Sequence, residues 1–282
     1  WDVESLSHTI AERRANFTYA PSPLLNEITR SWERHPHRWK SLTTVLHSAS
    51  KADPQVLAAF AEVSGGRLVE GWGMTENSGG LVTATTPADL TAGTELFDTV
   101  GRAVVETGVR VVDAGGTDLA HDGVTVGELL VSSPALADGY WNQPDATAAA
   151  FRAGWYHTGD LGTIDPAGYV RIAERRTDLI VSGGMNVYPS EVEQVIGADP
   201  RVAACAVVGI PHAQWGQAVA AAVVRASGAG GLDASDVIEV CRAHLASYKK
   251  PTAVVFLDAL PMTHSMKIAR AEVRRLLAAQ CG

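Results

Sequence analysis

The chain has 282 residues, of which 46% are apolar and 19% charged, a composition typical of folded globular proteins and not of disordered ones. Its 23 Lys and Arg stand against 31 Asp and Glu, and the formal charge of −8 disfavours nucleic-acid binding. The longest apolar runs, such as 203–210 and 218–224, are far shorter than the roughly 20 residues that a membrane-spanning helix needs. We therefore expect one large domain or two smaller ones and no membrane span.

The cysteines and the first residues of the chain bear on its cellular setting and on where the sequence begins. The three cysteines lack the spacing of a metal or redox site, which favours a reducing, cytoplasmic setting. The chain starts at Trp1 without an initiator Met and without a secretory leader. This start predicts that the sequence begins inside a longer protein.

Residues 1–95 have the pattern of an α/β layer. Apolar residues recur at helical spacing over 4–30, interrupted by a strand end and a turn at 19–23. Asp53 and Pro54 predict the capped start of a further helix. The expected buried strands are 42–46 and 67–70, and the second is expected to end in a Gly-rich loop. This β-α-β-α-β order predicts the last part of a large α/β domain.

The periodicity changes after about residue 96. Short alternating segments separated by Asp and Gly turns predict a β-rich subdomain with strands at 108–112, 127–132 and 168–172. The expected elements beyond 178 are helices from 190, 235 and 268, and strands at 202–208, 218–224 and 253–257. Asp233 and Asp236 predict a capping box at the middle helix.

The predicted fold class is α/β: a partial large N-terminal α/β domain with a β-rich subdomain, followed by a small α+β C-terminal domain. The expected domain bounds are 1–176, divided into 1–95 and 96–176, and then 177–282.

Two motifs in the first domain carry residues suited to a nucleotide. The segment 71–76 combines glycines, which allow close backbone approach, with the hydroxyl of Thr75 and the metal-ligating carboxylate of Glu76. The segment 155–160 ends in Asp160, whose carboxylate can accept hydrogen bonds from both hydroxyls of a ribose. Taken alone, the first motif is as consistent with a plain turn as with a ligand loop, and the second is more often a structural turn.

Two further motifs lie near and within the second domain. The segment 175–189 places charge before an apolar run and paired glycines after it, which fits either a hinge or a strand and β-turn ahead of the helix that Pro189 opens. Lys267 stands on a polar loop just before the last helix. A single loop lysine is usually solvated, so this residue alone predicts nothing.

The order and spacing of the four motifs resemble the adenylate-forming superfamily, which includes acyl-CoA synthetases, luciferases and adenylation domains. The segments 127–131 and 139–144, followed by 147–151, look like the family's core between its nucleotide loops. The segment 182–193 is similar to that of acyl-CoA and aryl-CoA ligases and differs from the Arg-Gly-Phe-Arg type of peptide-synthetase domains. The resemblance covers essentially the whole chain.

The resemblance implies an ATP-dependent acid–thiol ligase. Such enzymes attack the α-phosphate of MgATP with a carboxylate, release pyrophosphate, and let the thiol of CoA displace AMP from the acyl-adenylate. The implied partners are therefore a small carboxylic acid, ATP, Mg²⁺ and CoA, with fatty acid metabolism as one expected setting. The second domain is implied to rotate between the two half-reactions.

The resemblance also assigns roles to individual positions. It places the ribose on Asp160 with help from Arg175, the adenine against Trp72 and Gly73, the phosphate on Thr75, and Mg²⁺ on Glu76. Lys267 is implied to bridge carboxylate and phosphate oxygens, and Thr177 to be the pivot. The pantetheine tunnel is implied to lie at Gly183 and Gly184, and the acyl pocket at Asn77, Ser78 and Gly79.

Several positions depart from the family pattern. Trp72 stands where most relatives have Tyr, Thr177 where they have Asp or Lys, and Met266 where a Gly usually precedes the lysine; Ser48 and Ala49 replace a glycine pair. No Ser/Thr/Gly-rich phosphate loop followed by Lys-Gly occurs in the chain. We therefore expect about half of a synthetase of about 500 residues, as a fragment or split protein that needs the missing N-terminal half and forms little adenylate alone. The alternative is a nucleotide-binding or interaction module without chemistry of its own.

Overall fold

The computed structural model divides the chain into two compact units, Trp1–Ile172 and Ala173–Gly282. The domain boundary expected from the sequence, between residues 176 and 177, stays a prediction. The structure describes residues 2–48, 52–91, 95–175, 177–228, 231–263 and 267–281. Ala49, Arg176 and Met266, which the sequence analysis considered, lie outside these ranges.

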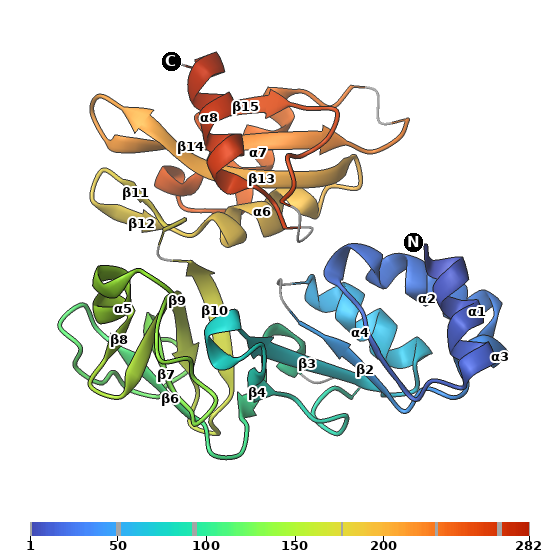
Figure 1. The fold of residues 1–282 in the computed structure, drawn as a ribbon. Helices are drawn as coiled ribbons and strands as arrows, with labels where there is room; N and C mark the ends of the chain where they lie inside the picture. The colour runs from blue at the N-terminus through green and yellow to red at the C-terminus, as the bar shows by residue number, and fades with distance from the viewer. Residues whose placement is uncertain are drawn as a thin grey trace. The chain divides into compact units, whose positions relative to one another are not determined.

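The first unit begins with a five-stranded sheet in the order β1-β2-β3-β4-β5 (Figure 1). The first three strands run parallel, and β4 and β5 continue the sheet antiparallel. The strands are β1 (Phe17–Tyr19), β2 (Thr44–His47), β3 (Leu68–Gly73), β4 (Leu81–Ala84) and β5 (Arg102–Ala103). A parallel sheet built through crossing helices is the arrangement that the sequence predicted for this part of the chain.

Helices pack on this sheet around an aromatic core. Trp32 stacks on Trp39 with ring centroids 5.2 Å apart and meets Phe60 edge-on at 6.0 Å. Asp53 caps its helix as predicted, accepting a 2.7 Å hydrogen bond from the N–H of Gln55. The helices are α1 (Val3–Arg13), α2 (Leu25–Arg34), α3 (Pro36–Trp39) and α4 (Pro54–Val63), with 3₁₀ turns η1 (Ser22–Leu24), η2 (Thr75–Asn77) and η3 (Leu96–Asp98).

A second sheet forms the β-rich part of the first unit, with the order β10-β9-β7-β6 and β8 paired to β9 (Figure 1). Two of its strands have the predicted bounds, whereas β9 was not predicted as a strand. The elements are β6 (Gly108–Val112), β7 (Gly127–Ser132), α5 (Pro144–Ala150), β8 (Phe151–Arg152), β9 (Trp155–Ile164) and β10 (Val170–Arg175), the last of which ends in the second unit.

The second unit is a mixed sheet between helices. Its strand order is β12-β11-β14-β13, and β15 pairs in parallel with β14. The elements are β11 (Ile180–Ser182), β12 (Met185–Val187), α6 (Pro189–Gly197), β13 (Val202–His212), β14 (Gly216–Arg225), α7 (Ala234–His244), η4 (Ser247–Lys249), β15 (Ala253–Phe256) and α8 (Arg270–Cys281). Together with the first unit, this confirms the predicted α/β fold class with a small α+β C-terminal part.

Both faces of this sheet are buried, which explains the uninterrupted apolar runs of β13 and β14. Val207, Val219 and Val223 belong to the core that includes residues of α6 and α7. The alternate positions face the core that includes Val273 and Leu277 of α8. Because successive strand residues point to opposite faces, a strand covered on both sides is apolar throughout.

The predicted capping box at α7 is confirmed. Asp233 accepts a 3.0 Å hydrogen bond from the N–H of Asp236, and the Asp236 carboxylate accepts one of 3.3 Å from the N–H of Asp233. Each bond satisfies a backbone donor that the helix itself cannot. In the described ranges, no helix combines the length and apolar character needed to cross a membrane.

Candidate active site

The glycines at 71 and 73 lie in a strand and not in the loop that the sequence predicted. Gly71 pairs with Ala84, and Gly73 with Leu81, across the β3–β4 hairpin. A Cβ on Gly71 would come within 2.8 Å of the Leu81 side chain, and one on Gly73 within 2.4 Å of the Gly80 carbonyl oxygen. The glycines therefore serve close strand pairing, and the loop begins only at Met74.

The loop after β3 is held by its own polar side chains. Asn77 is 2% exposed, and its Nδ2 donates to the carbonyl oxygens of Gly80 and Leu81 at 3.4 and 3.3 Å. Ser78, in the left-handed region at φ 55°, donates to the Ala135 carbonyl at 2.7 Å. These contacts fix the loop, and the role of Asn77, Ser78 and Gly79 in an acyl pocket stays a prediction.

The first two predicted nucleotide motifs meet through one hydrogen bond. Trp72 on β3 donates its indole N–H to Oδ2 of Asp160 on β9 at 2.9 Å. Asp160 is 3% exposed, and its own N–H donates to Oγ1 of Thr158 at 3.0 Å. Two motifs that are far apart in the sequence are thus in direct contact in the first unit.

The segment Thr158-Gly159-Asp160, which alone suggested a turn, lies inside the long strand β9. Gly159 has a φ of 69°. The β7–β9 register shifts at this point, since Glu128 pairs with Leu161 and Leu130 with His157, on either side of Gly159. No described atom lies within 4 Å of a Cβ built on Gly159, so the backbone conformation and not crowding requires glycine. The bulge turns the strand without ending it.

Most of the Trp72 ring belongs to the core. Its exposed fraction is 8%, and it packs with Val82, Leu129 and Ile164. A ring in this place can offer only part of its surface to a ligand. The implied contact between Trp72 and adenine stays a prediction.

Glu76 has partners that the sequence analysis missed. The hydroxyl of Tyr140 donates to Oε1 of Glu76 at 2.8 Å and lies 3.2 Å from the hydroxyl of Tyr156. Burial raises the pKa of Tyr156, and its hydrogen bonds to Tyr140 and Glu76 raise it further. The segment 139–144 is part of the family pattern, but nothing in the sequence pairs Tyr140 with Glu76.

The donor chemistry around Glu76 fits a nucleotide-borne Mg²⁺. Among the described residues, no three His, Cys, Asp or Glu side chains are placed to hold a metal ion. Mg²⁺ prefers oxygen ligands and is commonly bound by one or two carboxylates together with substrate phosphates and water, without an all-protein cage. The Glu76 carboxylate is of the type that such an ion uses, and its metal role stays a prediction.

A buried polar pair that the sequence did not predict joins the last residue of β2 to a residue inside β3. His47 and Glu70 face each other in register, and Nδ1 of His47 is hydrogen-bonded to Oε2 of Glu70. Nε2 of His47 lies 2.7 Å from Oγ of Ser22. Burial raises the pKa of Glu70 above its ordinary value, although His47 opposes the shift. The only sequence signal was an acidic residue within an apolar strand.

The remaining predicted residues lie in the second unit. The N–H groups of Asp178 and Leu179 donate to the carbonyl of Arg175, so a turn contains the exposed Thr177. The exposed Lys267 donates its N–H to Oγ1 of Thr263 at 3.1 Å. These positions are compatible with a pivot and a mobile lysine, which both stay predictions.

The glycine pair of the second unit forms a β-turn. Gly183 and Gly184 connect β11 to β12 with φ values of 57° and 81°, and the N–H of Gly183 donates to the Trp215 carbonyl at 2.9 Å. This is the strand-and-turn arrangement that the sequence allowed beside a hinge. A role of the two glycines at a pantetheine tunnel stays a prediction.

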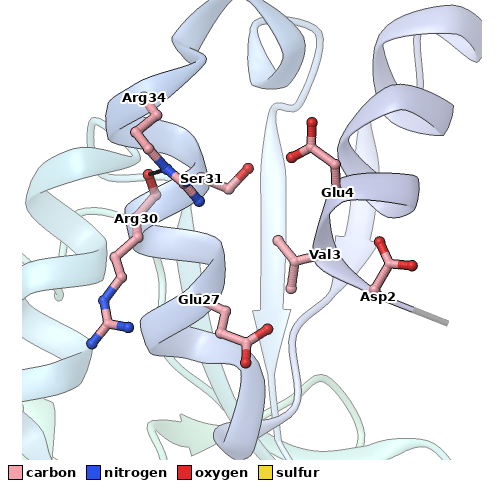
Figure 2. Close-up of a pocket in the computed structure, with 7 residues that line it drawn as sticks. All are labelled: Asp2, Val3, Glu4, Glu27, Arg30, Ser31 and Arg34. Atoms are coloured by element: carbon pink, nitrogen blue, oxygen red, sulfur yellow. Dashed lines mark hydrogen bonds between the residues drawn. The ribbon is translucent and has the colours of Figure 1, made fainter.

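A hollow between α1 and α2 contains none of the predicted site residues. It is lined by carboxylates of both helices and by guanidinium groups of α2, where Arg34 donates to the Arg30 carbonyl at 3.2 Å (Figure 2). Its lining residues are Asp2, Val3, Glu4, Glu27, Arg30, Ser31 and Arg34. The hollow is therefore separate from the Trp72–Asp160 contact.

Comparison with protein-family models shows to which family the chain belongs. Residues 1–141 match the family of AMP-binding enzymes, and residues 191–267 match the C-terminal domain of AMP-binding enzymes. The chain belongs to the AMP-binding enzyme family. This confirms the resemblance to adenylate-forming enzymes that its motifs indicated.

The relatives of this member of the AMP-binding enzyme family include ligases of aromatic acids. The chain is 37% identical to feruloyl-CoA synthase from Amycolatopsis sp over 246 aligned residues. The alignment covers 86% of the chain and 48% of that protein. The chain is 34% identical to indoleacetate–CoA ligase from Aromatoleum aromaticum, over 99% of the chain and 53% of that protein. The chain thus spans about half the length of the curated relatives it matches.

Solved structures of similar fold also match nearly the whole chain with about half of their own length. The amide bond synthetase McbA from Marinactinospora thermotolerans superimposes with a TM-score of 0.88 at 32% identity, over 98% of the chain and 55% of that structure. The o-succinylbenzoate CoA synthetase MenE from Bacillus subtilis, in complex with its acyl-adenylate intermediate, gives 0.85 at 27% identity, over 97% and 54%.

Proposed function

We propose that the whole protein activates a carboxylic acid with MgATP and transfers the acyl group to CoA. The acid's carboxylate oxygen attacks the α-phosphorus of ATP, and pyrophosphate leaves. The CoA thiol, losing its proton, then attacks the acyl carbon of the adenylate, and AMP leaves. The observation that carries this proposal is the hydrogen bond between Trp72 and Asp160, because it joins the two nucleotide motifs beside the Glu76 loop.

The residues of the first unit would bind and orient the nucleotide. A carboxylate has about four acceptor positions, so Asp160 can accept from ribose hydroxyls as well as from Trp72. Thr75 would donate to phosphate, and Gly73 would allow the backbone close to the ligand. Glu76 would hold Mg²⁺, which when bound neutralises charge on the phosphates.

The residues of the second unit would complete each half-reaction in turn. Arg175 would support Asp160 at the ribose, and Lys267 would stabilise the charge that develops during adenylation. A rotation at Thr177 would then exchange Lys267 for the Gly183–Gly184 turn, where the absence of side chains gives room for pantetheine. A boundary between residues 176 and 177 would separate the moving parts.

The proposed substrate is an aromatic acid. Relatives of the chain are ligases of ferulate, indoleacetate and 2-succinylbenzoate, which favours an aromatic acid over a fatty acid. The Asn77–Gly79 loop would border its ring. McbA, which is similarly related, is an amide bond synthetase, so the acceptor in the second step must be tested separately.

The test measures both half-reactions of the whole protein. Pyrophosphate release is followed with a panel of aryl and fatty acids, and product formation is followed with CoA or with an amine as acceptor. We expect release with aryl acids and thioester with CoA. Release only with fatty acids would contradict the proposed substrate class, amide without thioester would contradict the acceptor, and no release with any acid would favour the interaction module.

A further inference from the structure

The Glu76 loop is fastened to the segment 135–140 of the β-rich part. Besides the bond from the Tyr140 hydroxyl to Oε1 of Glu76, the N–H of Ala137 donates to the Glu76 carbonyl at 2.8 Å. Ser78 donates to the Ala135 carbonyl at 2.7 Å. Both the backbone and the side chain of Glu76 are thereby fixed relative to one short segment.

Tyr140 is itself held in place. Its N–H donates to Oγ1 of Thr147 at 2.9 Å, and its ring packs edge-on against Phe151 with centroids 5.7 Å apart. Gly139 has a φ of 155°, and a Cβ there would lie 2.3 Å from Cγ2 of Thr147, so only glycine allows this approach of α5. The backbone and the ring of Tyr140 are therefore both held in place, and this fixes the position of its hydroxyl.

We propose that Tyr140 is a positioning residue that orients the Glu76 carboxylate for a divalent cation carried by the nucleotide. This inference rests on the proposed function, in which Glu76 holds Mg²⁺. In this role Tyr140 acts only through Glu76, the side chain to which its hydroxyl donates.

The chemistry of the contact supports this role. Hydrogen bonds to a charged carboxylate are stronger than neutral ones, and one such bond fixes the plane of the group without exhausting its acceptor positions. The Tyr156 hydroxyl lies 3.2 Å from that of Tyr140, so the hydrogen-bond chain that ends at Oε1 of Glu76 continues to a second tyrosine. Removing a partner that orients a metal ligand typically weakens metal binding about 10- to 100-fold.

The experiment measures metal binding directly in the whole protein. Mn²⁺ replaces Mg²⁺, and its binding in the presence of ATP is followed by electron paramagnetic resonance. We expect Tyr140→Phe to weaken Mn²⁺ binding about 10- to 100-fold. Trp141→Phe is the matched control, because Trp141 is the next residue and is 89% exposed, and it should bind as the wild type does.

Kinetics separate positioning from a general loss of structure. Tyr140→Phe should need more Mg²⁺ for half-maximal adenylation and regain most of its kcat at saturating Mg²⁺, whereas a damaged fold would not be rescued. Tyr156→Phe should weaken binding by a smaller factor, about 2- to 10-fold. A larger effect at Tyr156 than at Tyr140 would contradict the assignment.

Glu76→Gln distinguishes the inference from the proposal beneath it. If Glu76→Gln loses Mn²⁺ binding while Tyr140→Phe binds normally, the positioning role is wrong and the proposed function stands. If Glu76→Gln binds Mn²⁺ as the wild type does, the metal role of Glu76 fails and the positioning role fails with it. Glu62→Gln, at an exposed position of α4, controls for the change of charge.

Discussion

At the scale of single residues, the indole N–H of Trp72 satisfies a carboxylate that is almost fully buried. The bond to Asp160 is 2.9 Å long, and the acceptor is 3% exposed. A buried charge without its donors is costly, so this bond also stabilises the unit that it connects. The proposed nucleotide binding and the stability of the first unit would therefore depend on the same side chain.

Replacing Trp72 with Phe keeps an aromatic ring but removes this donor. Because hydrogen bonds to charged groups contribute about 1.5–3 kcal/mol, the free energy of unfolding of the first unit should fall by about that amount. Urea titration of the chain measures it. Trp141→Phe, at an exposed position, should change the free energy by less than about 0.5 kcal/mol, and equal losses in both variants would contradict the assignment.

Lys267 is assigned to the first half-reaction only. In the whole protein, Lys267→Ala should slow acyl-adenylate formation by a factor of about 10² to 10³, because it removes one donor to developing charge. Thioester formation from supplied acyl-adenylate should continue. Lys40→Ala, also at an exposed lysine, should affect neither step, and an equal loss of both steps in Lys267→Ala would contradict its role.

At the scale of elements, the parallel strands β2 and β3 place His47 and Glu70 side by side in the interior. Burial raises the pKa of the Glu70 carboxyl above its ordinary 4.5, so the folded unit binds this proton more tightly than the unfolded chain does. The contribution of protonated Glu70 is complete below 4.5 and is lost as the pH rises through the raised pKa.

This pH dependence can be isolated by Glu70→Gln. The free energy of unfolding of the wild type, relative to that of Glu70→Gln, should be highest at and below pH 4.5 and decrease as the pH rises through the raised pKa. Urea titrations of both proteins at a series of pH values measure the difference. A difference that grows with pH would show that the carboxylate form is favoured by folding.

The sequence predicted elements better than it predicted contacts. The bounds of β6 and β7 and the cap of α4 follow from local patterns, because alternation and capping act over a few residues. The sequence did not predict β9 as a strand, because Gly159 and its polar neighbours have the composition of a turn although they form a bulge inside the strand. The Tyr140–Glu76 bond joins residues far apart in the chain, so no local pattern could predict it.

At the scale of the whole molecule, the chain contains most of the proposed contacts to a nucleotide but no loop for its outer phosphates. Feruloyl-CoA synthase and McbA cover 86% and 98% of the chain, but the chain covers only 48% and 55% of these two proteins. The order of the four motifs was specific enough to indicate the superfamily before the fold was known. The acid was not predictable, because few of the residues expected to line its pocket are in this sequence.

The chain alone should therefore form little acyl-adenylate. Purified residues 1–282 with ATP, Mg²⁺ and the acid preferred by the whole protein should release pyrophosphate at a rate near the background, because no Ser/Thr/Gly-rich loop holds the β- and γ-phosphates. The whole protein under the same conditions is the control. Turnover by the chain at the rate of the whole protein would contradict this prediction.

The alanines of β14 have a consequence for Lys267. Ala218, Ala220 and Ala222 meet Val273 and Leu277 of α8, and their small size sets how near the helix axis comes to the sheet. Lys267 stands only a few residues before α8 begins. A bulkier side chain at Ala220 would push α8 away from the sheet and displace the backbone near Lys267 with it. The small side chains buried in the second unit therefore help to set the position of an exposed lysine.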